Sequence, residues 1–153
     1  MITFRPLFPA EFDAYLALGL AEYAEDLAAN YRLSPDRAAA ESALGAANDL
    51  PQGQATPGQT LFAITAPGLP LIGYLWFHES PDSQSAFIND FSILPAYQNR
   101  GHGTAALAAL SAHLRAKGIT QIRLRVAANN PRAQALYAAT GFFPTGTNMA
   151  KSL

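Results

Sequence analysis

The chain has 153 residues, of which 50% are hydrophobic and 14% are charged, and its net charge at pH 7 is −1. This length fits one domain over residues 1–153, with enough apolar side chains for a core. The near-neutral charge gives no electrostatic reason to expect nucleic acid or an anionic membrane as a partner. Because the chain contains no cysteine, a thiol nucleophile, a disulfide and a cysteine metal site are excluded.

The N-terminal residues do not resemble a targeting segment. They read MITFRPLFPAEF and lack the charged and then apolar layout of a secretion signal. No apolar run approaches the roughly 20 residues that span a bilayer. We therefore expect a cytoplasmic protein that does not enter a membrane.

Hydrophobic spacing predicts one strand, two helices and a strand hairpin in the N-terminal half. Ile2 and Phe4 alternate with polar neighbours, as in a strand, and helical spacing of apolar residues begins after Pro9. Ser34 is a suitable N-cap for a second helix that starts at Pro35. The expected ranges are 1–7 for the strand, 9–27 and 35–49 for the helices, and 59–66 and 71–79 for the hairpin.

The C-terminal half continues with strands and helices in alternation. Gly118 and Gly141 are suitable stops for its two helices, and Asn130 is an N-cap for the second. The expected ranges are 87–94, 102–117, 120–126 and 131–140, followed by closing strands at 142–143 and 147–152. The order β-α-α-β-β-β-α-β-α-β-β predicts an α/β fold, with a mixed sheet and helices on both faces.

A strand, a turn with two glycines and a helix follow one another in residues 86–104. The first amides of a helix have no partner within it, and the helix dipole adds partial positive charge there. Gly101 and Gly103 let the backbone approach a phosphate closely. These features predict that a phosphorylated ligand lies on residues 98–104, although the two glycines could also serve only to start the helix.

Two stretches resemble motifs of the GCN5-related N-acetyltransferases, the GNAT superfamily. Residues 98–103, Gln-Asn-Arg-Gly-His-Gly, match the acetyl-CoA signature Gln/Arg-x-x-Gly-x-Gly/Ala. Residues 130–142 match a second block, Asn-x-x-Ala-x-x-Leu-Tyr-x-x-x-Gly-Phe. Asp90, the 50–53 loop and the 148–153 ending are similar to those of small bacterial members that have no assigned substrate. The resemblance covers nearly the whole chain and implies a central sheet that splays open.

The resemblance also implies an activity. The protein would transfer an acetyl group from acetyl-CoA to a primary amine by direct attack, without a metal. The alternative is a non-catalytic module of the same fold that binds or senses acyl-CoA. The acceptor amine, the size of the acyl group and the oligomeric state stay open, and a homodimer is one option that the family offers.

The resemblance places CoA on the glycine turn and on the strand before it. Backbone amides of the turn would hold the pyrophosphate, and Ile93 would donate to the thioester carbonyl and stabilise its oxyanion. Arg100 and His102 could equally be solvated surface residues, and Asn130 could serve only as a cap. The residues expected at the cofactor are Ile93, Leu94, Gln98, Asn99, Arg100, Gly101, His102, Gly103, Thr104, Asn130 and Tyr137.

Proton transfer requires an acid and a base. The resemblance implies that Tyr137 occupies the family's general-acid position. A phenol with a pKa of about 10 can protonate the leaving thiolate. Packing on the inner face of its helix is the alternative. Asp90 is the first candidate for the base and Glu79 the second, and either could instead be structural. Many family members carry a Glu one residue earlier, where this chain has Asn89.

Overall fold

A computed structural model describes residues 1–153, apart from the side chain of Pro81. The chain forms two compact units, each built from two separate stretches of sequence. The sheet unit comprises Met1–Phe8 and Gln54–Arg125, and the helical unit comprises Pro9–Gly53 and Val126–Leu153. The expectation of a single domain over residues 1–153 stays a prediction. Among the described residues, no helix combines the length and apolar character that crossing a bilayer requires.

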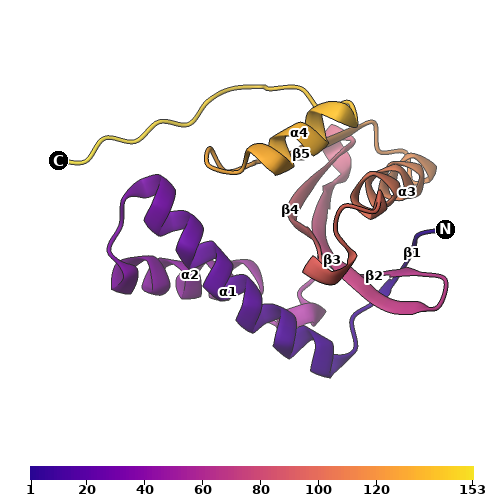
Figure 1. Ribbon diagram of the computed structural model, residues 1–153, viewed down its shortest axis with the longest axis horizontal. Helices are drawn as coiled ribbons and strands as arrows, with labels where there is room; N and C mark the ends of the chain where they lie inside the picture. The colour runs from indigo at the N-terminus through magenta and orange to yellow at the C-terminus, as the bar shows by residue number, and fades with distance from the viewer. The chain divides into compact units, whose positions relative to one another are not determined.

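Five strands and four α-helices are labelled in Figure 1. The sheet unit contains β1 (Thr3–Pro6), β2 (Gln59–Ala66), β3 (Leu69–Ser80), β4 (Ser85–Ile93), α3 (His102–Ala116) and β5 (Gln121–Leu124), with short 3₁₀ turns η2 (Pro81–Ser83) and η3 (Pro95–Tyr97). The helical unit contains α1 (Pro9–Tyr31), α2 (Pro35–Asp49) and α4 (Pro131–Ala139), and η1 (Gly53–Ala55) lies where the two units join in sequence.

The five strands form one mixed sheet in the order β1-β2-β3-β4-β5. The pairs β1–β2, β2–β3 and β3–β4 are antiparallel, whereas β5 pairs with β4 in parallel. A parallel neighbour requires a crossover connection, and α3 provides it (Figure 1). The expected α/β fold with a mixed sheet is confirmed. The strand expected at the centre, β4, is the fourth of five.

Helix α3 covers one face of this sheet. The His113 ring of α3 meets the rings of Phe62 and Phe77 edge-on, at centroid distances of 5.9 and 6.4 Å. Burying a large apolar side chain in this layer contributes about 1.5–3 kcal/mol to stability. The buried residues of α3 recur at helical spacing: Ala106, Leu107, Leu110 and Leu114.

The helical unit is built on a helical hairpin. Helices α1 and α2 pack on each other, and the buried Ser42 hydroxyl of α2 donates to the Leu20 carbonyl of α1 at 2.7 Å. Near the end of α1, the Asn30 side chain donates to Asn129 Oδ1 at 2.9 Å, just before α4 begins. A half-open apolar pocket of about 240 Å³ lies along the hairpin and the segment that follows α2, and it is lined by Phe12, Leu16, Leu20, Ala43, Ala46, Ala47, Leu50 and Gly53.

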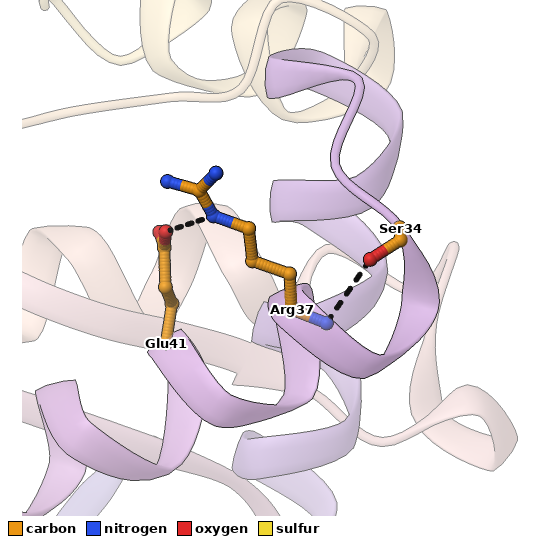
Figure 2. A network of polar contacts seen from close by, with 3 residues as sticks. All are labelled: Ser34, Arg37 and Glu41. Carbon is orange, nitrogen blue, oxygen red and sulfur yellow. Dashed lines mark hydrogen bonds and ion pairs between the residues drawn. The ribbon is translucent and has the colours of Figure 1, made fainter.

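The start of α2 follows the sequence prediction (Figure 2). Ser34 has extended backbone angles, and its hydroxyl accepts a hydrogen bond from the Arg37 N–H at 3.3 Å. This bond satisfies one of the amides that a helix leaves unpaired in its first turn. The Arg37 side chain pairs with Glu41 one turn later at 3.1 Å, but both side chains are exposed to solvent. Such exposed pairs contribute little to stability.

The closing strands predicted at 142–143 and 147–152 are wrong, because residues 142–153 contain no strand. The physical reason lies at the end of α4. The Phe142 N–H donates to the Tyr137 carbonyl at 3.0 Å, and the Phe142 ring packs on the Tyr137 ring. Phe142 therefore completes the helix end. Pro144 and Gly146 then disfavour strand pairing in the exposed residues that follow.

The cap of α2 should matter more than the neighbouring ion pair. Replacing Ser34 with Ala should lower the free energy of unfolding by about 1 kcal/mol, since the Arg37 amide loses its acceptor. Replacing Glu41 with Gln should lower it by only about 0.3 kcal/mol. Urea unfolding of both variants and of Ser34→Asp, which retains a cap, measures the difference. Equal losses in the first two variants would contradict this ranking.

Candidate functional site

Strand β4 has an open edge over its second half. Pairing with β5 covers only Ser85–Ile88, which lie opposite Gln121–Leu124. On the other side, β4 stays paired with β3 as far as Ile93. In the described part of the chain, residues 89–93 of β4 therefore have no strand partner on the β5 side. Their outward backbone groups are therefore not bonded to a neighbouring strand, as the implied splaying of the sheet requires, and the outward Ile93 carbonyl accepts from the Gln98 side chain instead.

A β-bulge lies where β5 leaves β4. Phe77 of β3 is opposite Ile88, and Trp76 is opposite Asp90, so Asn89 is an extra residue in β4. The Asn89 Oδ1 lies 2.7 Å from His78 Nδ1, within hydrogen-bond distance. A bulge bends its strand and increases the local twist. The bulge thus separates a fully paired half of β4 from the half with the open edge.

The register of β3 and β4 fixes which backbone groups face the open edge. Ile93 is opposite Gly73, and the Leu94 N–H donates to the Ile72 carbonyl at 2.8 Å. This pattern identifies Ile93 and Gly73 as a non-hydrogen-bonded antiparallel pair, in which both residues turn their own N–H and C=O groups outward. The N–H and C=O of Ile93 therefore point away from β3, as do those of Phe91, two residues earlier.

The pair of Gly73 and Ile93 requires a glycine. A Cβ placed on Gly73 would lie 2.2 Å from the Ser92 carbonyl oxygen and 3.2 Å from the Ile93 Cα. No side chain fits at that distance from backbone atoms. Gly73 is not among the site residues predicted from the sequence, although an isolated glycine inside the apolar strand LIGYLW is a sign of close backbone approach.

A tight turn connects the open edge to α3. The Tyr97 N–H donates to the Leu94 carbonyl at 2.8 Å, and the Gln98 side-chain amide donates to the Ile93 carbonyl at 2.8 Å. Asn99 and Gly101 follow with left-handed backbone angles, φ 61° and φ 80°. Asn and Gly are the residues that adopt this conformation most readily.

The start of α3 offers unpaired amides. Gly101 is the N-cap residue and supplies no side-chain hydrogen bond, and its carbonyl accepts the first bond of the helix from the Ala105 N–H at 3.0 Å. The amides of His102, Gly103 and Thr104 thus lack partners within the helix. Together with the helix dipole, they form an anion-binding position. Arg100 is exposed beside them.

The sheet unit brings together most of the residues predicted to bind the cofactor. Ile93, with the run from Gln98 to Thr104, lies along the open edge and the turn. Leu94 is adjacent, but its N–H and C=O already bond Ile72 and Tyr97. Asp90 is half-buried and lies opposite Trp76, on the face of the sheet that α3 does not cover.

Glu79 lies elsewhere. Glu79 is opposite Ala86, at the other end of the β3–β4 hairpin. It lies six residues along β3 from Gly73, and six residues of an extended strand span about 20 Å. Its carboxylate pairs with the Lys117 ammonium at the end of α3. The structure therefore does not bring Glu79 to the open edge, and Asp90 is the carboxylate that it does bring there.

The second motif spans α4 in the helical unit and forms both ends of this helix. The Asn130 side chain caps the helix by accepting from the Ala133 N–H at 3.1 Å, which confirms the predicted cap. At the other end, Gly141 has φ 98° and donates to the Ala138 carbonyl, while Phe142 donates to the Tyr137 carbonyl. This is a Schellman motif, with the expected apolar contact between the Tyr137 and Phe142 rings at 5.4 Å.

An open strand edge that leads to unpaired amides of a helix defines a site for an extended ligand with a phosphate group. Comparison with known proteins identifies the class. Residues 46–142 match the model of the acetyltransferase (GNAT) family. YycN of Bacillus subtilis (strain 168), an uncharacterized N-acetyltransferase, is 34% identical over 154 residues that cover 99% of each chain. The crystal structure of YycN has a TM-score of 0.94 and covers 100% of this chain and 99% of its own.

More distant structures share the fold. The PaiA N-acetyltransferase of Thermoplasma acidophilum, in complex with coenzyme A, has a TM-score of 0.70 at 18% identity, covering 97% of this chain and 93% of its own. The spermidine N-acetyltransferase of Vibrio cholerae, in complex with CoA and spermine, has a TM-score of 0.64 at 22% identity, covering 95% and 82%. The chain belongs to the acetyltransferase (GNAT) family and is an acyltransferase, so the resemblance found in the sequence is confirmed.

The close approach of β4 to Gly73 predicts that a larger residue at this position destabilises the sheet. Gly73→Ala should lower the free energy of unfolding by about 1–3 kcal/mol, because the added methyl group must displace the β4 backbone. Gly19→Ala is the control. A Cβ placed on Gly19 in α1 would have no atom within 4 Å, and Ala should stabilise that helix by about 0.5–1 kcal/mol. Chemical unfolding measures both, and a Gly73→Ala protein as stable as wild type would contradict the pairing.

Proposed function

We propose that the protein transfers the acetyl group of acetyl-CoA to a primary amine, by direct attack of the amine on the thioester. The observation that carries this proposal is the open edge of β4, where Ile93 turns its N–H outward close in sequence to the unpaired amides of α3. A ligand with a pyrophosphate, an extended arm and a terminal carbonyl has complementary groups in the same order. The crystal structures of two proteins of the same fold are of complexes with CoA, which supports this choice of ligand.

Cofactor binding is assigned mainly to backbone groups. The amides of His102, Gly103 and Thr104 hold the pyrophosphate, and Gly101 leaves room for it to approach. Arg100 adds a positive charge, and Asn99 and Gln98 shape the turn that precedes the helix. Phe91 binds the pantetheine arm through its outward N–H and C=O, as an added strand would be bound at a sheet edge.

The transfer requires three further roles. The Ile93 N–H donates to the thioester carbonyl and stabilises the negative charge that develops on its oxygen as the amine attacks. Asp90 takes the proton from the attacking nitrogen, directly or through water. Tyr137 gives a proton to the sulfur as the carbon–sulfur bond breaks, and solvent restores it. The products are an amide and free CoA, and all protons are accounted for.

The proposed role of Asp90 is supported by its position in the structure, whereas that of Tyr137 is supported by its position in the second motif. Asp90 is a half-buried carboxylate in the strand that carries Ile93, at the same open half of β4. Tyr137 and Asn130 are assigned from their place in the second motif, in which Asn130 adds a cofactor contact to its role as a cap.

Release of free CoA thiol from acetyl-CoA tests the reaction. The purified protein should release thiol faster than the amine-free background with at least one acceptor in a panel of protein N-termini, lysines, polyamines, amino acids and aminoglycosides. Calorimetric titration with CoA is the parallel measurement. CoA binding without thiol release for any amine would instead identify a non-catalytic acyl-CoA-binding module, and absence of CoA binding would contradict the site itself.

Tyr137→Phe tests the general acid. Phe retains the ring that packs on Phe142 and removes only the hydroxyl, so the helix end should persist. We expect kcat to fall by roughly 10²–10⁴-fold, with little change in the Kd for CoA. Tyr31→Phe in α1 removes a hydroxyl from the same unit and should leave kcat within about twofold of wild type. An unchanged kcat for Tyr137→Phe would assign Tyr137 to packing alone.

A further inference from the structure

Gln98 connects the phosphate-binding turn to the open strand edge. Its side-chain Nε2 donates to the Ile93 carbonyl at 2.8 Å, and its backbone N–H donates to the Pro95 carbonyl at 3.3 Å. The side chain is half-buried. A residue of the turn thus bonds the same residue of β4 whose N–H faces outward.

The bonded carbonyl belongs to a peptide group that is fixed at both ends. The peptide between Ile93 and Leu94 contributes the Ile93 C=O to Gln98 on one side and the Leu94 N–H to Ile72 on the other, each at 2.8 Å. Just beyond this peptide, the bond from Tyr97 N–H to the Leu94 carbonyl closes the η3 turn. The end of β4 is therefore held from β3, from η3 and from Gln98.

The Ile93 carbonyl would otherwise interfere with the proposed reaction. An open strand edge presents C=O as well as N–H groups, and those of Ile93 point in the same direction. A thioester carbonyl needs a donor and is repelled by a second carbonyl oxygen. With the Gln98 amide on the Ile93 oxygen, the group left to face an incoming carbonyl at this residue is the N–H.

We propose that Gln98 is a positioning residue, which orients the Ile93 N–H toward the thioester carbonyl by holding the Ile93 C=O with its side-chain amide. This inference rests on the proposed acetyl-CoA site. Gln98 would also fix the position of Ile93, which binds the acyl group, relative to the turn that binds the pyrophosphate. Misplacing reacting groups by about 1 Å can cost as much as 10²-fold in rate.

The thioester carbonyl itself reports the role, without any acceptor amine. A hydrogen bond to a carbonyl oxygen lowers its stretching frequency, so infrared difference spectra of acetyl-CoA labelled with ¹³C at the acetyl carbonyl measure the Ile93 contact. In the wild-type complex the band should lie below that of free acetyl-CoA. In Gln98→Met, which has a similar length but no N–H, it should move back toward the free value, while the Kd for CoA stays within about threefold.

Two further variants separate positioning from general stability. Gln98→Arg restores a long side chain with N–H donors and should return the band toward the wild-type frequency. Gln54→Met is the matched control, since Gln54 also donates from its side-chain amide to a backbone carbonyl, that of Leu7, at 3.0 Å. It should change thermal stability without moving the band. Once an acceptor is known, kcat of Gln98→Met should be roughly 10- to 100-fold lower, with rescue by Gln98→Arg.

Each outcome has a distinct meaning. An unshifted band in Gln98→Met, or loss of CoA binding in that variant, would overturn the positioning role. If Gln98→Met does not fold, Gln98→Leu, which is also uncharged and has no N–H donor, gives the same comparison. A lowered wild-type band that returns in Gln98→Met, together with no thiol release for any amine, would uphold the role of Gln98 and overturn the proposed transfer reaction.

Discussion

The structure of the sheet unit depends on where β5 ends. Pairing stops at Ile88 and Leu124, so the next residues of β4 keep one side bonded to β3 and leave the other side open. Backbone N–H and C=O groups need partners, and an open edge inside a sheet leaves that need unmet. The Asn89 bulge, the missing side chain at Gly73 and the Gln98 amide all act at this point. They determine which backbone groups remain for a ligand.

The second motif has a structural meaning that is independent of chemistry. Its Tyr, Gly and Phe occupy the three positions that complete a Schellman helix end, and its Asn caps the other end of the same helix. Tyr137 therefore packs on Phe142 whether or not its hydroxyl takes part in a reaction. The packed and the catalytic interpretations of this tyrosine are compatible, because the ring serves one and the oxygen the other.

Local signals allowed much of the fold to be predicted. The bounds of β2, the Ser34 cap of α2, and the start of α3 follow from adjacent residues, because turns, caps and helix ends are determined by short-range chemistry. The closing strands failed since the hydrogen bond of Phe142 to the helix end outweighed its strand propensity. The pairing of Glu79 with Lys117 and the approach of Gly73 to Ser92 join residues 38 and 19 positions apart, which no local pattern reveals.

The bulge at Asn89 also changes which face of the sheet each later side chain of β4 occupies. In a regular strand Ile88 and Asp90 would share a face, but the extra residue places Ile88, Phe91 and Ile93 on the face toward α3 and turns Asp90 to the opposite face. Without this shift Asp90 would lie under α3, and the Ile93 N–H would point into the ladder with β3. The extra residue Asn89 thus determines both the face of the sheet on which the Asp90 carboxylate lies and the direction in which the Ile93 N–H points. Substitution of Asn89 can alter the hydrogen bond between its side chain and His78. Only the insertion or deletion of a residue in β4 can alter which face the later side chains occupy.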